Sequence, residues 1–240
     1  GGQPCGSAWA SAYQRTLRTE LLLAYAPTHL LALLGQWNMP KRLPIKLKNE
    51  PLVEGLCELW ISGSPGIHSM VPGILFSRFP NEVGDIEQLP IASLPEPIRA
   101  NEPGLVHAPL VRVKWRGFIV SVGSRVLSIS APPPYVGWRE FKRNAIELFT
   151  AVLESGLVKR VERYSVKYVN LFQFDRSPTP SEALDWALRV GPHEVTPETV
   201  SLHLERKVGD IITIIRFTAD AVVQRSSGPA MRGAIVDVDT

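Results

Sequence analysis

The chain lacks most of the patterns from which an activity is normally recognised. It has two cysteines in 240 residues, Cys5 and Cys57, and its five histidines show no paired metal-ligand spacing. It contains no nucleophile elbow, phosphate-binding loop or dinucleotide glycine fingerprint. These absences favour a protein without catalysis over an enzyme, and they predict no cofactor.

Long apolar runs and a strong net charge are missing too. No stretch reaches the about 18 uninterrupted apolar residues of a transmembrane helix, so we expect no membrane partner. The formal charge is only +3, and a field this weak does not by itself indicate a nucleic-acid binder. Two thiols form no disulfide framework, which favours a reducing compartment and predicts a cytoplasmic protein.

What is present is the balance of a globular protein, with 45% hydrophobic and 20% charged residues. The 21 prolines favour short strands and loops over long helices. Alternating apolar and polar residues predict strands in eight segments. These are residues 52–61, 110–116, 118–122, 125–130, 158–174, 200–207, 211–223 and 233–238.

Two segments predict helices that pack on these strands. Apolar residues recur at three- and four-residue steps over about residues 137–155, which predicts one long amphipathic helix. A capping box at residues 179–182 predicts a short helix at about 180–190. Residues 70–79 are compatible with one or two helical turns, and residues 81–109 have little periodicity and predict a loop. The expected fold class is α+β, with a mostly antiparallel sheet.

The two ends of the chain differ from its middle. The first methionine is Met39, and a Gly/Ala/Ser-rich stretch and an apolar run broken by Pro27 precede it. Two arginines before that run give it a superficial likeness to a signal peptide, which Glu20 and Pro27 weaken. We therefore expect residues 1–38 to be an extraneous or disordered leader and residues 39–240 to form a single domain. Its last strand ends without a turn or cap, which predicts truncation at the C-terminus.

A basic segment supports one functional hypothesis. Residues 105–170 carry eleven basic and four acidic residues. Arg112, Lys114 and Arg116 share one face of a predicted strand, and such a cationic row is what phosphate binding needs. This pattern makes a nucleic-acid-binding protein an alternative function. A solvated strand face is the simpler interpretation.

The strand at residues 160–170 is unusually polar and supports a second hypothesis. Its arginine, tyrosine and asparagine side chains can bind an anionic or amide-bearing partner. The structural interpretation is that Glu162 or the pair Glu54 and Glu58 neutralises the arginines. The candidate residues for binding a partner or ligand are Arg160, Arg163, Tyr164, Tyr168 and Asn170, with Trp138 at the start of the predicted long helix.

Asp237 and Asp239 support a third hypothesis. They lie two residues apart on a predicted strand, so both carboxylates face the same way. Such a pair can hold a hard cation, and with acids from the first strand it would make a metal-dependent enzyme. No third ligand can be identified, and a strand end in solvent is the simpler interpretation.

Four segments in this order resemble a known family. They are NEPLVEGLCE at 49–58, YVGWREF at 135–141, KRVERY at 159–164 with YVN at 168–170, and VDVD at 236–239. Together they resemble a sporadically distributed family of uncharacterised prokaryotic proteins with no established function. The resemblance covers about residues 39–240. It implies that relatives start near Met39 and continue past the terminal strand into a helical segment. It adds no catalytic residue, and the family's patchy distribution is typical of mobile or defence-associated genes.

These observations favour a non-catalytic binding or interaction module for an unknown protein or ligand. The nucleic-acid-binding protein and the metal-dependent enzyme remain the alternatives.

Overall fold

The structure, a computed structural model, describes residues 50–173, 189–195, 200–223 and 230–240. The chain divides into two compact units, Gly1–Glu50 and Pro51–Thr240. All described residues except Glu50 belong to the second unit. The predicted boundary after residue 38 lies outside the described residues.

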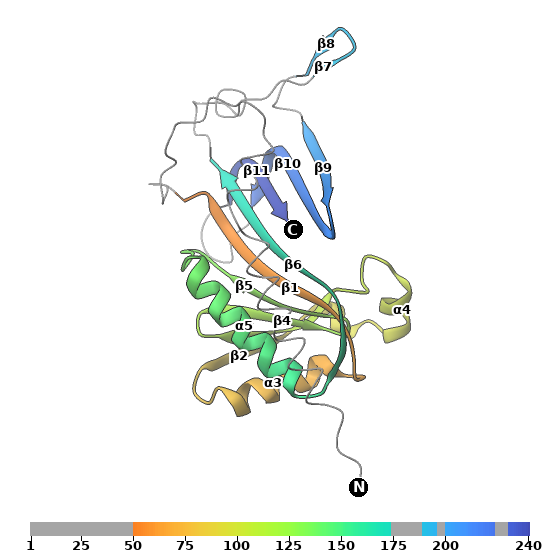
Figure 1. The fold of residues 1–240 in the computed structure, drawn as a ribbon, viewed down its shortest axis with the longest axis vertical. Coiled ribbons are helices and arrows are strands. Elements are labelled where there is room, and N and C mark those ends of the chain that lie inside the picture. The colour runs from red at the N-terminus through yellow and green to blue at the C-terminus, as the bar shows by residue number, and fades with distance from the viewer. Residues whose placement is uncertain (1–49, 174–188, 196–199, 224–229) are drawn as a thin grey trace. The chain divides into compact units, whose positions relative to one another are not determined.

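A nine-stranded antiparallel sheet dominates the second unit (Figure 1). Its strand order is β2-β3-β4-β5-β1-β6-β11-β10-β9, so the first strand lies in the centre and joins the two halves of the sheet. The strands are β1 (Leu52–Gly63), β2 (Val83–Gln88), β3 (Pro109–Trp115), β4 (Phe118–Gly123), β5 (Val126–Ala131), β6 (Val158–Phe172), β9 (Ser201–Val208), β10 (Ile211–Val223) and β11 (Met231–Asp239). A separate hairpin pairs β7 (Arg189–Val190) with β8 (His193–Glu194).

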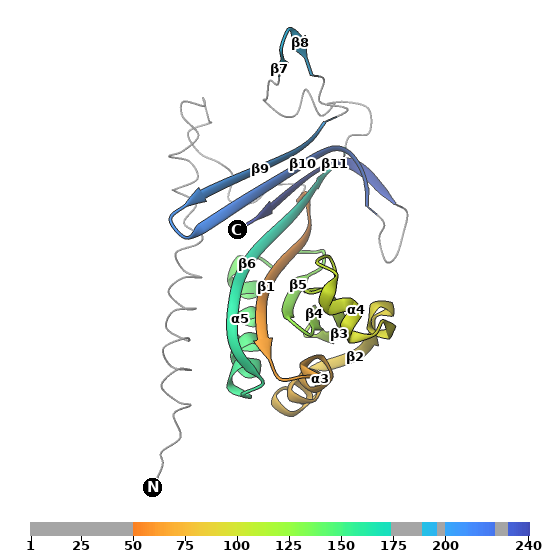
Figure 2. The same ribbon diagram turned by 90° about the vertical axis from the view of Figure 1, so that its right-hand side faces the viewer.

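The helical segments lie beside the half of the sheet that runs from β2 to β6. They are α3 (Ile67–Arg78), the 3₁₀ turn η1 (Pro90–Ser93), α4 (Glu96–Asn101) and α5 (Trp138–Glu154). Figures 1 and 2 show α5 running alongside the long strands β1 and β6. Among the described residues, no helix has both the length and the apolar character needed to cross a membrane.

The hydrophobic core lies on the face of the sheet that meets α3 and α5. Alternate residues of β1 point into it, with Leu59 and Ile61 at 1% and 0% exposure. Aromatic rings join the layers, because Phe118 lies 6.0 Å from the Phe141 ring of α5. The intervening residues of β1, which include Trp60, point to the other face. The core and the polar face are therefore set by the same alternation.

The predicted fold class needs correction, although the antiparallel sheet itself is confirmed. Strands make up 52% and helices 23% of the described residues, so the sheet dominates and three α-helices share the helical part. The expected layout of one long packing helix with one short companion is wrong. The prediction missed β2 and α4 because their segment is rich in proline and acidic residues and has no apolar period. Of the predicted short helix, residues 180–188 lie outside the described residues and 189–190 form β7.

Candidate functional site

Charged side chains gather on the polar face of β1, β6, β11 and β10. The register places Lys167 opposite Asp239 and Arg216 opposite Asp237, so these side chains share one face. We call this set the charged cluster, which consists of Glu58, Arg163, Lys167, Arg216, Asp237 and Asp239. Three acids and three bases make it close to neutral as a whole.

Asp237 is the most buried member of the charged cluster, at 8% exposure. Its Oδ2 accepts from Lys167 Nζ at 2.9 Å and lies 3.3 Å from an Arg216 guanidinium nitrogen. Asp239 makes one weaker contact, in which its Oδ2 lies 3.4 Å from a guanidinium nitrogen of Arg163. All of these contacts use one oxygen of each carboxylate.

An aromatic stack borders the charged cluster. The Trp60 ring lies parallel to the His107 ring at 3.8 Å, and the Arg163 guanidinium lies 4.7 Å from the Trp60 ring centre. Trp60 Nε1 donates a 2.7 Å hydrogen bond to Glu58 Oε1. Trp60 therefore contacts both Glu58, at the nitrogen edge of the indole, and Arg163, over its face.

The ionisation of this region is shifted by its burial. Burial raises the pKa of the Glu58 carboxyl; the hydrogen bond from Trp60 opposes this rise and the charge of Asp239 adds to it. Burial also lowers the pKa of His107, and the cation of Arg125 lowers it further. Glu58 is thus held where its negative charge is disfavoured.

Two carboxylate oxygens in the charged cluster have no donor. Asp237 Oδ1 and Asp239 Oδ1 are both buried, and neither has a hydrogen-bond partner among the described residues. Buried polar atoms are nearly always hydrogen-bonded, because a missing partner leaves the desolvation of the atom uncompensated. The charged cluster therefore has two unsatisfied acceptors, and an N–H group is the chemistry that would complete it.

The contacts of Asp237 and Asp239 give the predicted cation site little support, and it stays a prediction. Among the residues that the structure describes, no three His, Cys, Asp or Glu side chains lie close enough to hold a metal ion. The bases Arg163, Lys167 and Arg216 contact these carboxylates instead. Their contacts occupy the Oδ2 atoms of both carboxylates, which leaves only one oxygen of each for a metal ion.

The predicted partner-binding residues of β6 are divided between the two faces of the sheet. Arg163 alone joins the charged cluster. Tyr168 lies on the helix side, where its hydroxyl is 3.0 Å from that of Tyr135 and Tyr135 contacts Phe141 edge-on. Tyr164 lies four residues before Tyr168 on β6, so strand alternation places it on the same side.

The remaining predicted residues make local contacts. Arg160 pairs with Glu162 at 3.1 Å, and Asn170 lies 3.4 Å from the Val236 carbonyl on β11. Trp138 begins α5, with its ring 6.3 Å from Phe141. A register shift between β1 and β6 lies between Arg163 and Arg160, so Arg160 does not share the face of Tyr164 and Tyr168 despite the even spacing.

The predicted basic row on β3 is also divided. Lys114 pairs with Asp85 at 2.7 Å, and Arg112 lies opposite Glu87 in the register. Arg116 leaves the strand, because it and Gly117 form the hairpin turn with φ values of 50° and 82°. These three cations therefore do not present one face.

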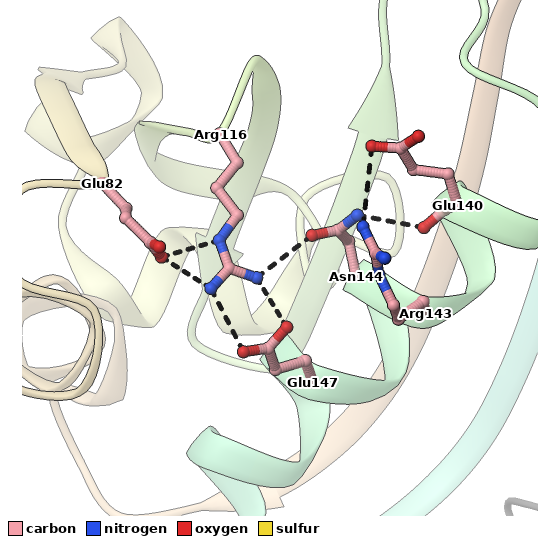
Figure 3. A network of polar contacts seen from close by, with 6 residues as sticks. All are labelled: Glu82, Arg116, Glu140, Arg143, Asn144 and Glu147. Carbon is pink, nitrogen blue, oxygen red and sulfur yellow. Dashed lines mark hydrogen bonds and ion pairs between the residues drawn. The ribbon is translucent and has the colours of Figure 1, made fainter.

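Arg116 instead binds three side chains from two other segments (Figure 3). Its guanidinium donates to Glu82 at 2.6 Å, to Glu147 at 2.5 Å and to the Asn144 carbonyl oxygen at 3.2 Å. It also lies 4.6 Å from the Trp115 ring centre. We call Arg116, Glu82, Asn144 and Glu147 the Arg116 network. It links the β3–β4 turn to α5 and to the segment before β2, so its role is structural.

Sequence reasoning missed four residues of this region: Trp60, His107, Lys167 and Arg216. The alternation of β1 already placed Trp60 beside Glu58 on the polar side. Lys167 and Arg216 become visible only once β1, β6, β11 and β10 are known to be neighbours. His107 lies between α4 and β3, and only its stack on Trp60 places it here.

The comparisons with known proteins add no family. No protein-family model matches the chain, and no curated protein matches it. The resemblance to the sporadically distributed prokaryotic family therefore stays a prediction.

Proposed function

We propose that the protein is a non-catalytic binding module that takes an N–H-bearing group of a ligand or partner on the charged cluster. The observation that supports this most strongly is the pair of buried acceptors, Asp237 Oδ1 and Asp239 Oδ1, that have no donor among the described residues. Leaving a buried acceptor unpaired costs about 1–3 kcal/mol. A bound group that donates to both oxygens recovers that free energy.

The geometry of the two acceptors narrows the chemical class of the group. Alternate residues of a strand lie roughly 7 Å apart, so one bound group must present several N–H donors to serve both carboxylates. A guanidinium does so with a rigid, charged fork, and a primary amide does so with two neutral donors. Hydrogen bonds to charged groups are the stronger kind, so the guanidinium is the favoured ligand group.

The two alternative functions receive less support. The cations of Lys114 and Arg116 are engaged with Asp85, Glu82 and Glu147, which weakens the argument for a phosphate-binding row. The bases around Asp237 weaken the argument for a metal-dependent enzyme. A cytoplasmic location and a mobile or defence-associated gene context remain predictions from the sequence.

The test is a calorimetric titration of the full chain with N-acetylarginine amide and with N-acetylasparagine amide. We expect saturable binding of the arginine probe. The variant Asp239→Asn should weaken it roughly tenfold, because a charge-assisted hydrogen bond is lost.

The matched control is Asp220→Asn, which removes the same charge from an exposed ion pair with Arg232 on β10 and β11. It should bind the arginine probe as the wild type does. The proposal is overturned if neither probe binds at about 10 mM, a concentration well above the affinities of specific sites. It is also overturned if both variants lose affinity equally.

A further inference from the structure

The strand β9 forms one margin of the nine-stranded sheet (Figures 1 and 2). It pairs with β10 on one side, and among the described residues no strand pairs with its other side. Seven of its eight residues are exposed, and it contains neither proline nor glycine. An outer edge of this kind presents unpaired backbone N–H and C=O groups that can accept another strand.

The side chains of β9 alternate between a largely apolar face, with Leu202, Leu204, Arg206 and Val208, and a polar face. Leu204 and Val208 are 54% and 55% exposed on the apolar face. The apolar surface continues onto β10, where Ile211 lies opposite Val208 and is 41% exposed. His203, Glu205 and Lys207 occupy the other face. Exposed apolar side chains grouped at a sheet edge are typical of an interaction surface.

We propose that β9 pairs antiparallel with β9 of a second copy of this chain, with Leu204 opposite Leu204 of that copy. This register places His203 opposite Glu205 twice across the two-fold axis, so an imidazole N–H can donate to each carboxylate. It pairs residues 201–207 of β9 with one another, leaves only Val208 opposite a residue before β9, and sets no like charges against each other. The remaining pairs are Leu202 with Arg206, Ser201 with Lys207 and Val200 with Val208.

Neighbouring registers that keep the same faces together are worse. A register centred on Glu205 sets two carboxylates against each other, and one centred on Arg206 sets two guanidiniums against each other. Like charges directly opposite destabilise a strand pair. A register centred on His203 leaves Arg206, Lys207 and Val208 opposite residues before the start of β9, whereas the register centred on Leu204 does so for Val208 alone. The self-complementarity of one register is what selects a second copy as the occupant of this edge.

This surface is distinct from the proposed ligand site, so the two proposals can fail separately. Sedimentation velocity of the full chain over about 1–100 µM should show a reversible monomer–dimer equilibrium, the range expected of a small interface. Leu204→Lys should raise the dimer dissociation constant at least about tenfold, because it places two ammonium groups together on the axis. Val222→Lys, at an apolar β10 position that is 67% exposed, should leave the constant unchanged.

Cross-linking tests the register. In a Cys5→Ser background, Leu204→Cys should form a disulfide-linked dimer on mild oxidation, because directly opposed residues have Cα atoms about 4.5–5.5 Å apart. Ser201→Cys should not, since it faces Lys207 of the second copy. The remaining cysteine, Cys57, is buried, and burial raises its thiol pKa to about 12, so it does not compete. A chain that stays monomeric at every concentration, or equal cross-linking at both positions, overturns the proposal.

Discussion

Two ion networks in this molecule contain the same kinds of side chain but differ in how completely their hydrogen bonds are satisfied. In the Arg116 network, one guanidinium serves two carboxylates and an amide, and it lies against aromatic rings. In the charged cluster, three bases serve only one oxygen each of Asp237 and Asp239, and the other oxygens are buried without a donor among the described residues. We call the Arg116 network closed, because its guanidinium joins all of its members, and the charged cluster open, because two of its acceptors have no donor among the described residues.

We expect the closed network to contribute mainly to the stability of the fold and the open network mainly to binding. A closed network loses stability when any member is removed, because the remaining partners are left unpaired. An open network already carries unpaired acceptors, so a conservative change there costs the fold little and costs the bound state more. Mutating each network in parallel therefore tests whether this distinction holds.

The largest effect is expected from Arg116→Ala. It leaves Glu82, Asn144 and Glu147 without their shared donor and removes the contact with Trp115, so the free energy of unfolding should fall by about 2–3 kcal/mol. Urea unfolding followed by tryptophan fluorescence measures it. The control Arg143→Ala breaks only an exposed 3.7 Å pair with Glu140 and should change stability by less than about 0.5 kcal/mol. Equal losses of unfolding free energy in the two variants would mean that the Arg116 network does not stabilise the fold.

A smaller effect is expected within α5 itself. Glu147→Gln keeps the shape of the side chain and one acceptor oxygen, but it loses the negative charge and one of the two bonds to Arg116, which should cost about 1–2 kcal/mol. Glu140→Gln removes the same charge from the same helix and should cost less than about 0.5 kcal/mol. Chemical denaturation of both variants gives the difference, and no difference would contradict the closed network.

The pH dependence of stability should distinguish Glu58. Because burial raises its pKa, the folded state holds this proton more tightly than the unfolded state does. Stability from this group is therefore present at low pH and is lost as the pH rises through the raised pKa. Glu58→Gln removes this loss and keeps the acceptor for Trp60.

The stability of Glu58→Gln relative to the wild type should thus increase from about pH 4 to pH 7. Urea unfolding at several pH values measures it, with Glu54→Gln on the same strand as the control for losing one carboxylate. A relative stability of the Glu58 variant that stays flat or decreases over this range would show that the charge of Glu58 is not disfavoured.

Much of the sheet follows from local patterns in the sequence. The alternation at residues 52–61 and 110–130 predicts strands whose buried side faces the core, and Leu59 and Ile61 lie there. The predicted helical layout was wrong because the proline- and acid-rich stretch that holds β2 and α4 gives no periodic signal. Local patterns therefore served for strands with one buried face and failed for exposed edges and short helices.

The site could be predicted only in fragments. Arg163, Asp237 and Asp239 were identified as candidates, but their association depends on β6 lying between β1 and β11, which no local pattern encodes. Plain strand alternation places Arg163 on the face opposite Tyr164 and Tyr168. The register shift beside Trp60 separates Arg160 from those tyrosines. Positive φ at Arg116 turned that cation from the strand face towards α5. Non-local pairing and single backbone irregularities account for the errors.

The most direct test of the open charged cluster is the free energy of unfolding of Asp239→Asn measured beside Arg116→Ala. Asparagine keeps an oxygen towards Arg163, and the carboxylate oxygen it replaces had no donor, so the account predicts a change of less than about 1 kcal/mol. A loss as large as that of Arg116→Ala would contradict the account, because the cluster would then serve the fold as the Arg116 network does.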